Sequence, residues 1–130
     1  MKYLCLICAE KVMEQMPAAD AKAHFQEYTE YTNAIRVSGH YLSCNRLLPP
    51  TEAITIRVRN GKITTTDGPY VETKEQLGGY YLIEARNLNE AIQVAARIPG
   101  AMLGCVEIRP VAEDEQTLKA LGFVDSETFR

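Results

Sequence analysis

Residues 66–85, TDGPYVETKEQLGGYYLIEA, decide how the rest of this chain is arranged. The stretch opens with the turn sequence DGP at residues 67–69, in which Asp accepts backbone hydrogen bonds, Gly tolerates positive φ and Pro fixes φ. It ends in YYLI at residues 80–83, whose aromatic and branched side chains are typical of a buried strand. About ten residues of irregular chain therefore separate two predicted strands, more than a simple hairpin needs. We expect this loop to contribute to function.

Length and composition indicate one soluble domain. The chain has 130 residues, of which 46% are hydrophobic and 24% are charged, as in ordinary globular proteins. The net charge is −3 and no basic stripe is present, so we expect no nucleic-acid binding. No apolar run approaches the roughly 20 residues of a membrane helix, so we expect no membrane partner. The segment MKYLCLICAE at residues 1–10 lacks a small-residue cleavage site and is predicted to be a first strand in a cytoplasmic protein.

Four cysteines occur, at Cys5, Cys8, Cys44 and Cys105. In a reducing compartment their thiols are expected to be free. The spacing of Cys5 and Cys8 is that of redox and zinc motifs, but residues three apart on a strand point to opposite faces. A zinc site would also need a second pair of ligands, which the sequence lacks. We therefore interpret these cysteines as small apolar side chains and expect no metal.

The rest of the chain alternates between strand and helix patterns. Strands are predicted at residues 2–9, 41–47, 53–59, 62–65, 80–85 and 103–111, and helices at residues 17–38 and 88–98. Asn60-Gly61 predicts a tight hairpin, and Asn87 with Glu90 resembles a capping box. The order β-α-β, hairpin, β-α-β predicts an α+β sandwich of ferredoxin-like type, with an antiparallel sheet and both helices on one face. The domain is predicted over residues 1–111. Residues 112–130 form a tail whose Leu118, Leu121, Phe123 and Phe129 need cover from the domain or a partner subunit.

Periodicity predicts which side chains face the core. Phe25, Tyr28, Thr32 and Ile35 form a stripe on the first helix. Ile54, Ile56 and Val58 are expected under the helices because they alternate with polar residues. The other face of the sheet is then predicted to carry Thr55, Arg57, Arg59, Tyr80, Leu82, Glu84, Cys105, Glu107 and Arg109. A face that mixes apolar and charged groups in this way is expected to be covered by the sheet of an identical subunit, giving a homodimer with a cleft between two sheets.

Residues 66–79, TDGPYVETKEQLGG, resemble the DGPF (DGPFAETKE) signature of the YCII-related domain proteins. Tyr70 stands where that signature has Phe, and Val71 where it has Ala. The resemblance covers about residues 1–111. Neighbouring stretches that also resemble the family are residues 56–61, 80–85, 88–99 and 106–111.

The resemblance implies a ferredoxin-like protomer and a dimeric α/β barrel. Proteins of this family are mostly uncharacterised bacterial proteins of the cytoplasm and are often associated with sigma factors of the extracytoplasmic-function class. The resemblance therefore implies a bacterial, cytoplasmic protein with a possible sigma-factor association. The wider YCII group has been suggested to hold a His–Asp pair in its cleft. His24 is similar to the His of that pattern. No Asp follows it at a comparable place in the helix, so Asp67 is a candidate partner.

The predicted catalytic residues are Asp67 and His24. Asp67 acts either as a general base at the cleft or as a cap of its turn, and His24 either moves protons or is simply packed. The predicted substrate-binding residues are Arg57, Tyr80, Glu107 and Arg109, for which ion pairing and packing between sheets are the alternative.

The residues and the family resemblance together leave two functions open. One is an enzyme that acts on a small polar metabolite by acid–base chemistry. The other is a non-catalytic ligand-binding or regulatory module associated with a sigma factor. No metal or nucleotide motif is present in the sequence, so we expect no obligatory cofactor.

Overall fold

The computed structural model describes residues 1–10 and 16–122. In chain order the elements are β1 (Lys2–Ala9), α2 (Ala18–Val37), β2 (Tyr41–Arg46), η1 (Pro50–Glu52), β3 (Ile54–Arg59), β4 (Lys62–Asp67), β5 (Gln76–Glu84), α3 (Leu88–Ala95), η2 (Pro99–Met102), β6 (Gly104–Pro110) and α4 (Glu115–Ala120). The two η elements are single 3₁₀ turns. This is the alternation that the sequence predicts, with the short helix α4 added in the tail.

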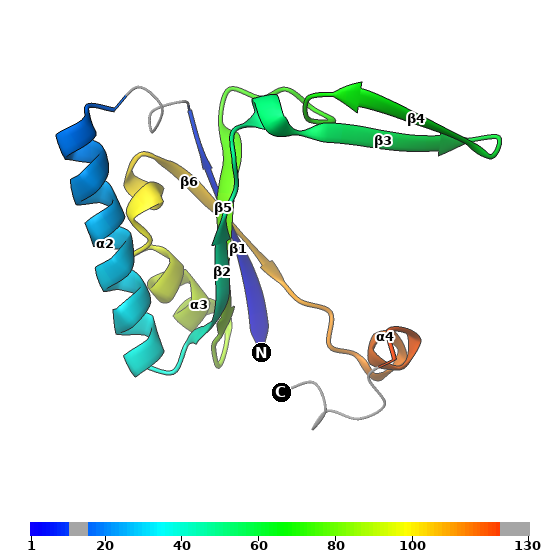
Figure 1. Cartoon of the computed structure of the whole chain (residues 1–130). Coiled ribbons are helices and arrows are strands. Elements are labelled where there is room, and N and C mark those ends of the chain that lie inside the picture. The colour runs from blue at the N-terminus through cyan, green and yellow to red at the C-terminus, as the bar shows by residue number, and fades with distance from the viewer. Residues whose placement is uncertain (11–15, 123–130) are drawn as a thin grey trace.

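Four strands form the main sheet, in the order β2-β5-β1-β6. Each neighbouring pair is antiparallel, with Cys5 of β1 opposite Tyr81 of β5 on one side and Ile108 of β6 on the other. Helices α2 and α3 both cover the same face of this sheet (Figure 1). The predicted α+β architecture, with an antiparallel sheet and helices on one face, is therefore confirmed.

The core lies between the helices and this covered face. Its buried side chains come from β1, β5, α2, α3 and the turn after α3, and they include Tyr3, Cys5, Tyr31, Ile35, Tyr81, Ile83, Val94 and Ile98. Of the predicted α2 stripe, Ile35 is fully buried and Tyr28 packs against the core. Phe25 was expected inside and is 44% exposed, whereas its neighbour His24 is only 8% exposed. The inward face is thus shifted by one residue, because His24, Tyr28, Tyr31 and Ile35 follow the period of 3.6 more closely.

The prediction for β3 is wrong. This strand pairs only with β4, in a separate two-stranded sheet that projects from the body on the side away from the helices (Figure 1). Ile54, Ile56 and Val58 are 63%, 64% and 55% exposed instead of lying under the helices. It follows that Thr55, Arg57 and Arg59 do not lie on the main sheet either. Alternation fixes which residues share a face, but it does not say which sheet a strand joins. We call residues 54–67 the arm.

Other boundaries also differ from those predicted. β5 begins at Gln76 rather than at residue 80, so the irregular loop is residues 68–75. The second helix ends at Ala95, before Pro99 starts a 3₁₀ turn. Asn87 caps that helix as predicted, with its side-chain oxygen 2.9 Å from Glu90 N. Phe123 and Phe129 of the predicted tail lie outside the described residues.

The second face of the main sheet, which we call the open face, is not covered by α2 or α3 (Figure 1). Alternation with the buried Tyr3 and Cys5 places Leu4 and Leu6 on it. The same argument places Leu82, Glu84, Cys105, Glu107 and Arg109 on this face. The mixed apolar and charged character predicted for β5 and β6 is confirmed.

Candidate functional site

A cavity of about 480 Å³ lies between α2 and one end of the main sheet. Its walls come from α2, the end of β1, the segment from β2 to η1, the start of β5 and the turn at η2. The lining residues are Ile7, Ala9, Glu10, His24, Phe25, Tyr28, Thr29, Thr32, Asn33, Arg36, Cys44, Asn45, Arg46, Leu47, Leu48, Pro49, Pro50, Gln76, Leu77, Gly78, Gly79, Tyr80, Tyr81, Gly100 and Leu103. A volume of this size suits a small molecule.

Aromatic rings form the wall between α2 and β5. The rings of Tyr28 and Tyr81 are stacked, with centroids 6.4 Å apart and planes at 5°. The hydroxyl of Thr32 donates a hydrogen bond of 2.8 Å to the backbone carbonyl of Tyr28. Its single proton is then used, so Thr32 Oγ1 accepts the 2.6 Å hydrogen bond from Tyr81 Oη. Burial raises the pKa of Tyr28 to about 12 and also raises that of Tyr81. Both side chains therefore remain neutral phenols near neutral pH, which donate hydrogen bonds rather than act as bases.

His24 lies in this wall one turn before Tyr28. Its ring meets the Tyr28 ring edge-on, with centroids 5.0 Å apart. Its Nδ1 atom is 3.8 Å from Glu27 Oε2, a carboxylate whose side chain is 62% exposed. His24 is thus a nearly buried imidazole that lines a cavity and has an acidic group within reach. Imidazole is the side chain best suited to exchange protons in the neutral pH range.

Two guanidinium groups supply positive charge at the cavity. Arg46 lies over the Phe25 ring at 5.1 Å, and Arg36 lies over the Tyr41 ring at 4.6 Å. Within the described parts of the chain, neither guanidinium forms an ion pair with a carboxylate. Glu10, which also lines the cavity, is paired with Lys74 at 3.3 Å. The forks of Arg36 and Arg46 are therefore available to an acidic ligand.

The predicted site residues fall in three places. His24 and Tyr80 line the cavity, and Tyr80 Oη accepts a hydrogen bond from Asn45 Nδ2 at 2.8 Å. Glu107 and Arg109 lie on the open face and pair with each other, with Arg109 Nε 2.6 Å from Glu107 Oε2. Arg57 lies on the arm, where it is exposed. Both residues border the cavity, but Tyr80 alternates with the buried Tyr81 on β5, which places its side chain on the open face. His24 is therefore the one predicted site residue whose side chain lies on the helix-covered side of the sheet among the described residues.

Asp67 ends β4 at the base of the arm and does not line the cavity. Its exposed carboxylate makes no hydrogen bond or ion pair with residues 1–10 or 16–122. The turn is held through Gly68 instead, whose N–H donates to Ala53 O at 2.7 Å and whose carbonyl accepts from Thr55 Oγ1 at 2.8 Å. The structure places Asp67 neither as the side-chain cap of its turn nor beside His24.

Sequence reasoning missed Arg36 and Arg46 as candidate binding groups. Arg36 is not part of the stripe predicted for the first helix, and Arg46 falls at the end of a strand without a motif. Tyr28 was predicted as core, although it also lines the cavity. The available signal was the helical spacing of His24 and Tyr28, which puts a titratable ring among aromatic residues on the inward face.

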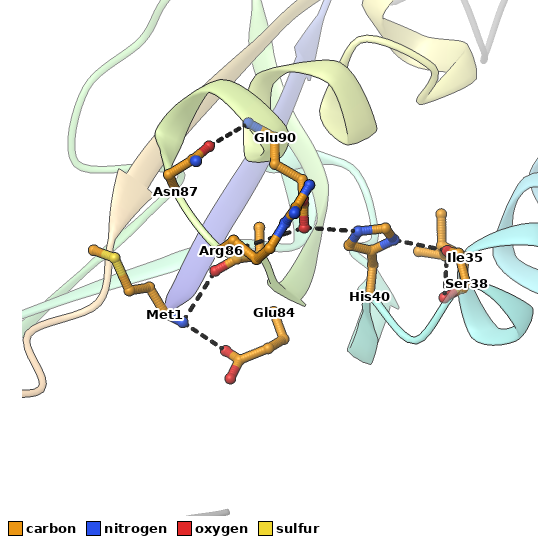
Figure 2. A network of polar contacts seen from close by, with 9 residues as sticks. Met1, Ile35, Ser38, His40, Glu84, Arg86, Asn87 and Glu90 are labelled. Atoms are coloured by element: carbon orange, nitrogen blue, oxygen red, sulfur yellow. Dashed lines mark hydrogen bonds and ion pairs between the residues drawn. The ribbon is translucent and has the colours of Figure 1, made fainter.

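A second polar network lies at the other end of α2 (Figure 2). His40 Nδ1 is 2.7 Å from Ser38 Oγ, and His40 Nε2 is 3.1 Å from Glu90 Oε1. Glu90 Oε2 also accepts from Arg86 Nε at 2.5 Å. Ser38 Oγ donates to Ile35 O, so the chain of contacts joins the end of α2 to the start of α3. We interpret this network as a brace between the two helices, apart from the cavity.

Two other kinds of feature are absent from the described residues. No cluster of three or more His, Cys, Asp or Glu side chains is arranged to hold a metal ion. No described helix is both long enough and apolar enough to pass through a membrane.

Together, the helix-covered antiparallel sheet and the aromatic cavity define a small α+β protein with a hollow of small-molecule size. The chain belongs to the YCII-related domain family, whose model matches residues 1–115. It is similar to uncharacterized protein R00369 of Rhizobium meliloti (strain 1021), with 45% identity over 69 residues. That alignment spans 52% of this chain and 56% of the relative, so the chain covers little more than half of the relative's length.

The fold is similar to that of a solved enzyme. This is 5-chloro-2-hydroxyhydroquinone dehydrochlorinase (TftG) from Burkholderia phenoliruptrix AC1100, in complex with 2,5-dihydroxybenzoquinone. The TM-score is 0.52 at 10% sequence identity, over 89% of this chain and 98% of that chain. At this identity the likeness shows the fold alone.

Proposed function

We propose that this protein is an enzyme that binds a small organic acid in the cavity between α2 and the sheet and acts on it by acid–base chemistry. The observation that carries the proposal is the position of His24, a nearly buried imidazole in the wall of a cavity of about 480 Å³. A histidine held there by packing can take a proton from a bound molecule or return one to it. In this proposal His24 is the catalytic acid or base.

The chemistry of the walls supports a particular class of ligand. The stacked Tyr28 and Tyr81 rings offer a flat apolar surface, while Arg36 and Arg46 lack carboxylate partners among the described residues. A planar or ring-containing molecule with one acidic group satisfies both features, because its acid pairs with a guanidinium while its body covers the rings. The sequence predicted a small polar metabolite as substrate. The cavity walls favour a narrower class within it, namely organic acids with an apolar body.

The experiment is a thermal-shift screen with hydroxylated benzoic acids, hydroxyquinones and short aliphatic acids as probes. Quinones are included because the solved structural neighbour is described in complex with one. A supporting compound raises the Tm of the wild type by several degrees and loses at least tenfold in affinity with Arg46→Gln. Its conversion by the wild type, followed by NMR, is abolished in His24→Gln while binding persists.

Asp67→Asn is the matched variant, because Asp67 was predicted as the partner of His24 but lies outside the cavity. Full turnover in Asp67→Asn assigns the chemistry to His24 alone, whereas loss of turnover with intact binding restores Asp67 as its partner. A compound that binds with equal affinity to Arg46→Gln contradicts the assigned cavity. A compound that binds but is never converted favours the ligand-binding module over the enzyme. The association with a sigma factor stays a prediction.

The assembly that the sequence predicts also remains a proposal. The order β2-β5-β1-β6 supports a ferredoxin-like protomer, and the uncovered apolar residues of the open face support a homodimer. The cleft between two sheets requires that second chain. The cavity beside His24, in contrast, is formed within one protomer.

A further inference from the structure

Three tyrosines pack against one another at the wall between α2 and β5. Tyr28 stacks on Tyr81, and Tyr31 meets Tyr81 edge-on. Tyr31 Oη donates its proton to the backbone carbonyl of Val94 at 2.8 Å, and Tyr81 Oη donates its proton to Thr32. A phenol has a single proton, so the hydroxyls of Tyr31 and Tyr81 have none left to offer a ligand.

The hydroxyl of Tyr28 differs, because its proton is not used in this way. Its oxygen accepts a hydrogen bond of 3.0 Å from Gly100 N, but it donates none to residues 1–10 or 16–122. Burial raises the pKa of Tyr28 to about 12, so the proton stays on the oxygen near neutral pH. The bond from Gly100 polarises the hydroxyl and strengthens it as a donor. Tyr28 and Gly100 both line the cavity, which thus has a donor without an acceptor.

The strand register fixes where this donor lies relative to Arg46. Arg46 of β2 is opposite Gly79 of β5, and Gly79 is opposite Ile7 of β1, so the three form one row across the cavity wall. The Tyr28 hydroxyl lies at the Ile7 end, because a Cβ atom on Gly100 would meet both Tyr28 Oη and Ile7 Cγ2 within 2.8 Å. With neighbouring strands about 4.8 Å apart, the backbones of Arg46 and Ile7 are separated by about 9–10 Å.

The middle of this row carries no side chain, because it is Gly79. A ligand whose acid pairs with Arg46 can therefore extend along the row until its far end reaches the Tyr28 hydroxyl. An oxygen on the opposite side of a six-membered ring from the acid reaches that hydroxyl. An oxygen on the ring position next to the acid stays near Arg46.

We propose that the Tyr28 hydroxyl donates a hydrogen bond to a second oxygen of the ligand, so that the bound acid carries a carbonyl or hydroxyl oxygen across a ring from its acidic group. This inference rests on the proposed function, since it takes Arg46 as the partner of the acid. Tyr28 is then the residue that selects among ring-containing acids, because an acid without that oxygen leaves the donor unpaired.

The first test measures affinities for 4-hydroxybenzoate, 2-hydroxybenzoate and benzoate by isothermal titration calorimetry. We expect the wild type to bind 4-hydroxybenzoate at least tenfold more tightly than either of the other acids, and Tyr28→Phe to reduce this ratio below threefold. A general loss of stability in Tyr28→Phe weakens all three acids and cancels from the ratio. Tyr81→Phe is the control and should keep the wild-type ratio, because the Tyr81 proton is already donated to Thr32.

The second test keeps the bond to Gly100 and changes only the donor, so it holds even if Tyr28→Phe misfolds. In a chain with 3-fluorotyrosine in place of Tyr28, the hydroxyl remains but its proton is more acidic. The preference for 4-hydroxybenzoate over benzoate should therefore rise above that of the wild type. A hydroxyl that serves the fold alone leaves this preference unchanged in both variants, which overturns the proposal.

Two further outcomes separate this inference from the proposed function. If acids bind and are converted through His24 but the wild type does not prefer 4-hydroxybenzoate, the role of Tyr28 fails and the proposed function stands. If no acid binds in a way that Arg46→Gln weakens, the proposed function fails and the role of Tyr28 fails with it.

Discussion

The backbone N–H of Gly100 donates a hydrogen bond of 3.0 Å to the hydroxyl oxygen of Tyr28. This contact joins the turn after α3 to the aromatic wall of the cavity, across 72 residues of sequence. Gly100 is buried, and removal of the hydroxyl leaves its N–H without this acceptor. The contact therefore couples the stability of the fold to the shape of the cavity.

Removal of the Tyr28 hydroxyl is expected to destabilise the protein. In Tyr28→Phe the buried N–H of Gly100 loses its acceptor, which costs about 1–3 kcal/mol. Urea denaturation should show that loss in the free energy of unfolding, with an unchanged m-value. Tyr41→Phe is the control, because the one contact of Tyr41 Oη with residues 1–10 and 16–122 is with Cys44 Sγ at 3.6 Å. Equal losses in the two variants would contradict the role given to the Gly100–Tyr28 bond.

Enlargement of Gly100 is expected to disturb the same wall. A Cβ atom there would lie 2.5 Å from Tyr28 Oη and 2.8 Å from Ile7 Cγ2, so Gly100→Ala requires both of these atoms, or the turn itself, to shift. Overpacking of this kind typically costs about 1–3 kcal/mol, and ligands of the cavity should bind more weakly. Gly78→Ala is the matched variant, since its nearest neighbour is Ile7 O at 4.0 Å. If Gly100→Ala has the same Tm and the same ligand affinity as Gly78→Ala, the close packing at Gly100 is refuted.

Acid is expected to weaken the brace between α2 and α3. The hydrogen bonds from the Arg86 side chain and backbone, and then that from His40, hold the pKa of Glu90 below its usual range. A carboxyl whose pKa is lower in the folded state than in the unfolded state stabilises the folded protein at pH values above its unfolded pKa, which is about 4.3 for Glu. That stabilisation is lost as the pH falls through the folded-state pKa. The Tm of the wild type should therefore exceed that of Glu90→Gln near neutral pH, and the two should converge under acid.

The control for this acid titration is Glu115→Gln, which removes the exposed pair of Glu115 with Lys119. Such surface pairs contribute little, so this variant should follow the wild type at every pH. A difference between the wild type and Glu90→Gln that persists unchanged into acid would exclude the ionised carboxylate as the cause.

Oxidation is expected to join Cys8 and Cys105. They lie directly opposite each other on β1 and β6, and opposed antiparallel residues have Cα atoms about 4.5–5.5 Å apart, within the range of a disulfide. With peroxide, the two thiols lose two electrons and two protons, and the peroxide becomes two waters. Burial, with Glu107 and Glu75, raises the pKa of Cys8, and burial, with Glu75, raises that of Cys105. Because the thiolate reacts, the rate should rise as pH increases beyond about 8.

Mass spectrometry of alkylated peptides measures this reaction. Burial raises the pKa of Cys5 to about 11, so the Cys5 thiol should stay reduced while the pair is oxidised. Cys105→Ser should form no disulfide within the chain. A bridge that includes Cys5 or Cys44, or a rate that does not depend on pH, would show that the β1–β6 register does not control the chemistry.

Local patterns in the sequence predicted most of the fold. Asn87 caps α3, Asn60-Gly61 turns the hairpin, and the helix predicted to reach Ser38 ends at Val37. These features depend on a few neighbouring residues, so the sequence contains all that determines them. The place of β3 was not predictable in this way, because Ile56 and Val58 form the same alternating pattern whether the strand joins the main sheet or a separate hairpin. Only long-range pairing decides that question.

The candidate site likewise contains one residue that local sequence predicted and others that only long-range packing brought to the cavity. His24 was identified from the sequence, and it lies in the wall of a cavity. Asp67, its predicted partner, and Arg57, a predicted substrate-binding residue, both lie on the arm. The positive charge at the cavity comes from Arg36 and Arg46 instead. The separation of two residues along the sequence does not predict whether both line the cavity, because five separate segments form its walls and they meet only in the folded protein.

The elements, their order, the antiparallel α+β class and the family could all be predicted from the residues. These predictions rest on periodicity, on turn chemistry and on the resemblance of residues 66–79 to the family's signature, and each of these is a pattern of a few neighbouring residues. The tertiary structure alone decided that β3 and β4 leave the main sheet as an arm and that His24 meets Tyr28 and Arg46 around a cavity. The physical reason is that packing joins residues far apart in the chain, and no local pattern specifies which of several apolar surfaces a strand or ring will cover.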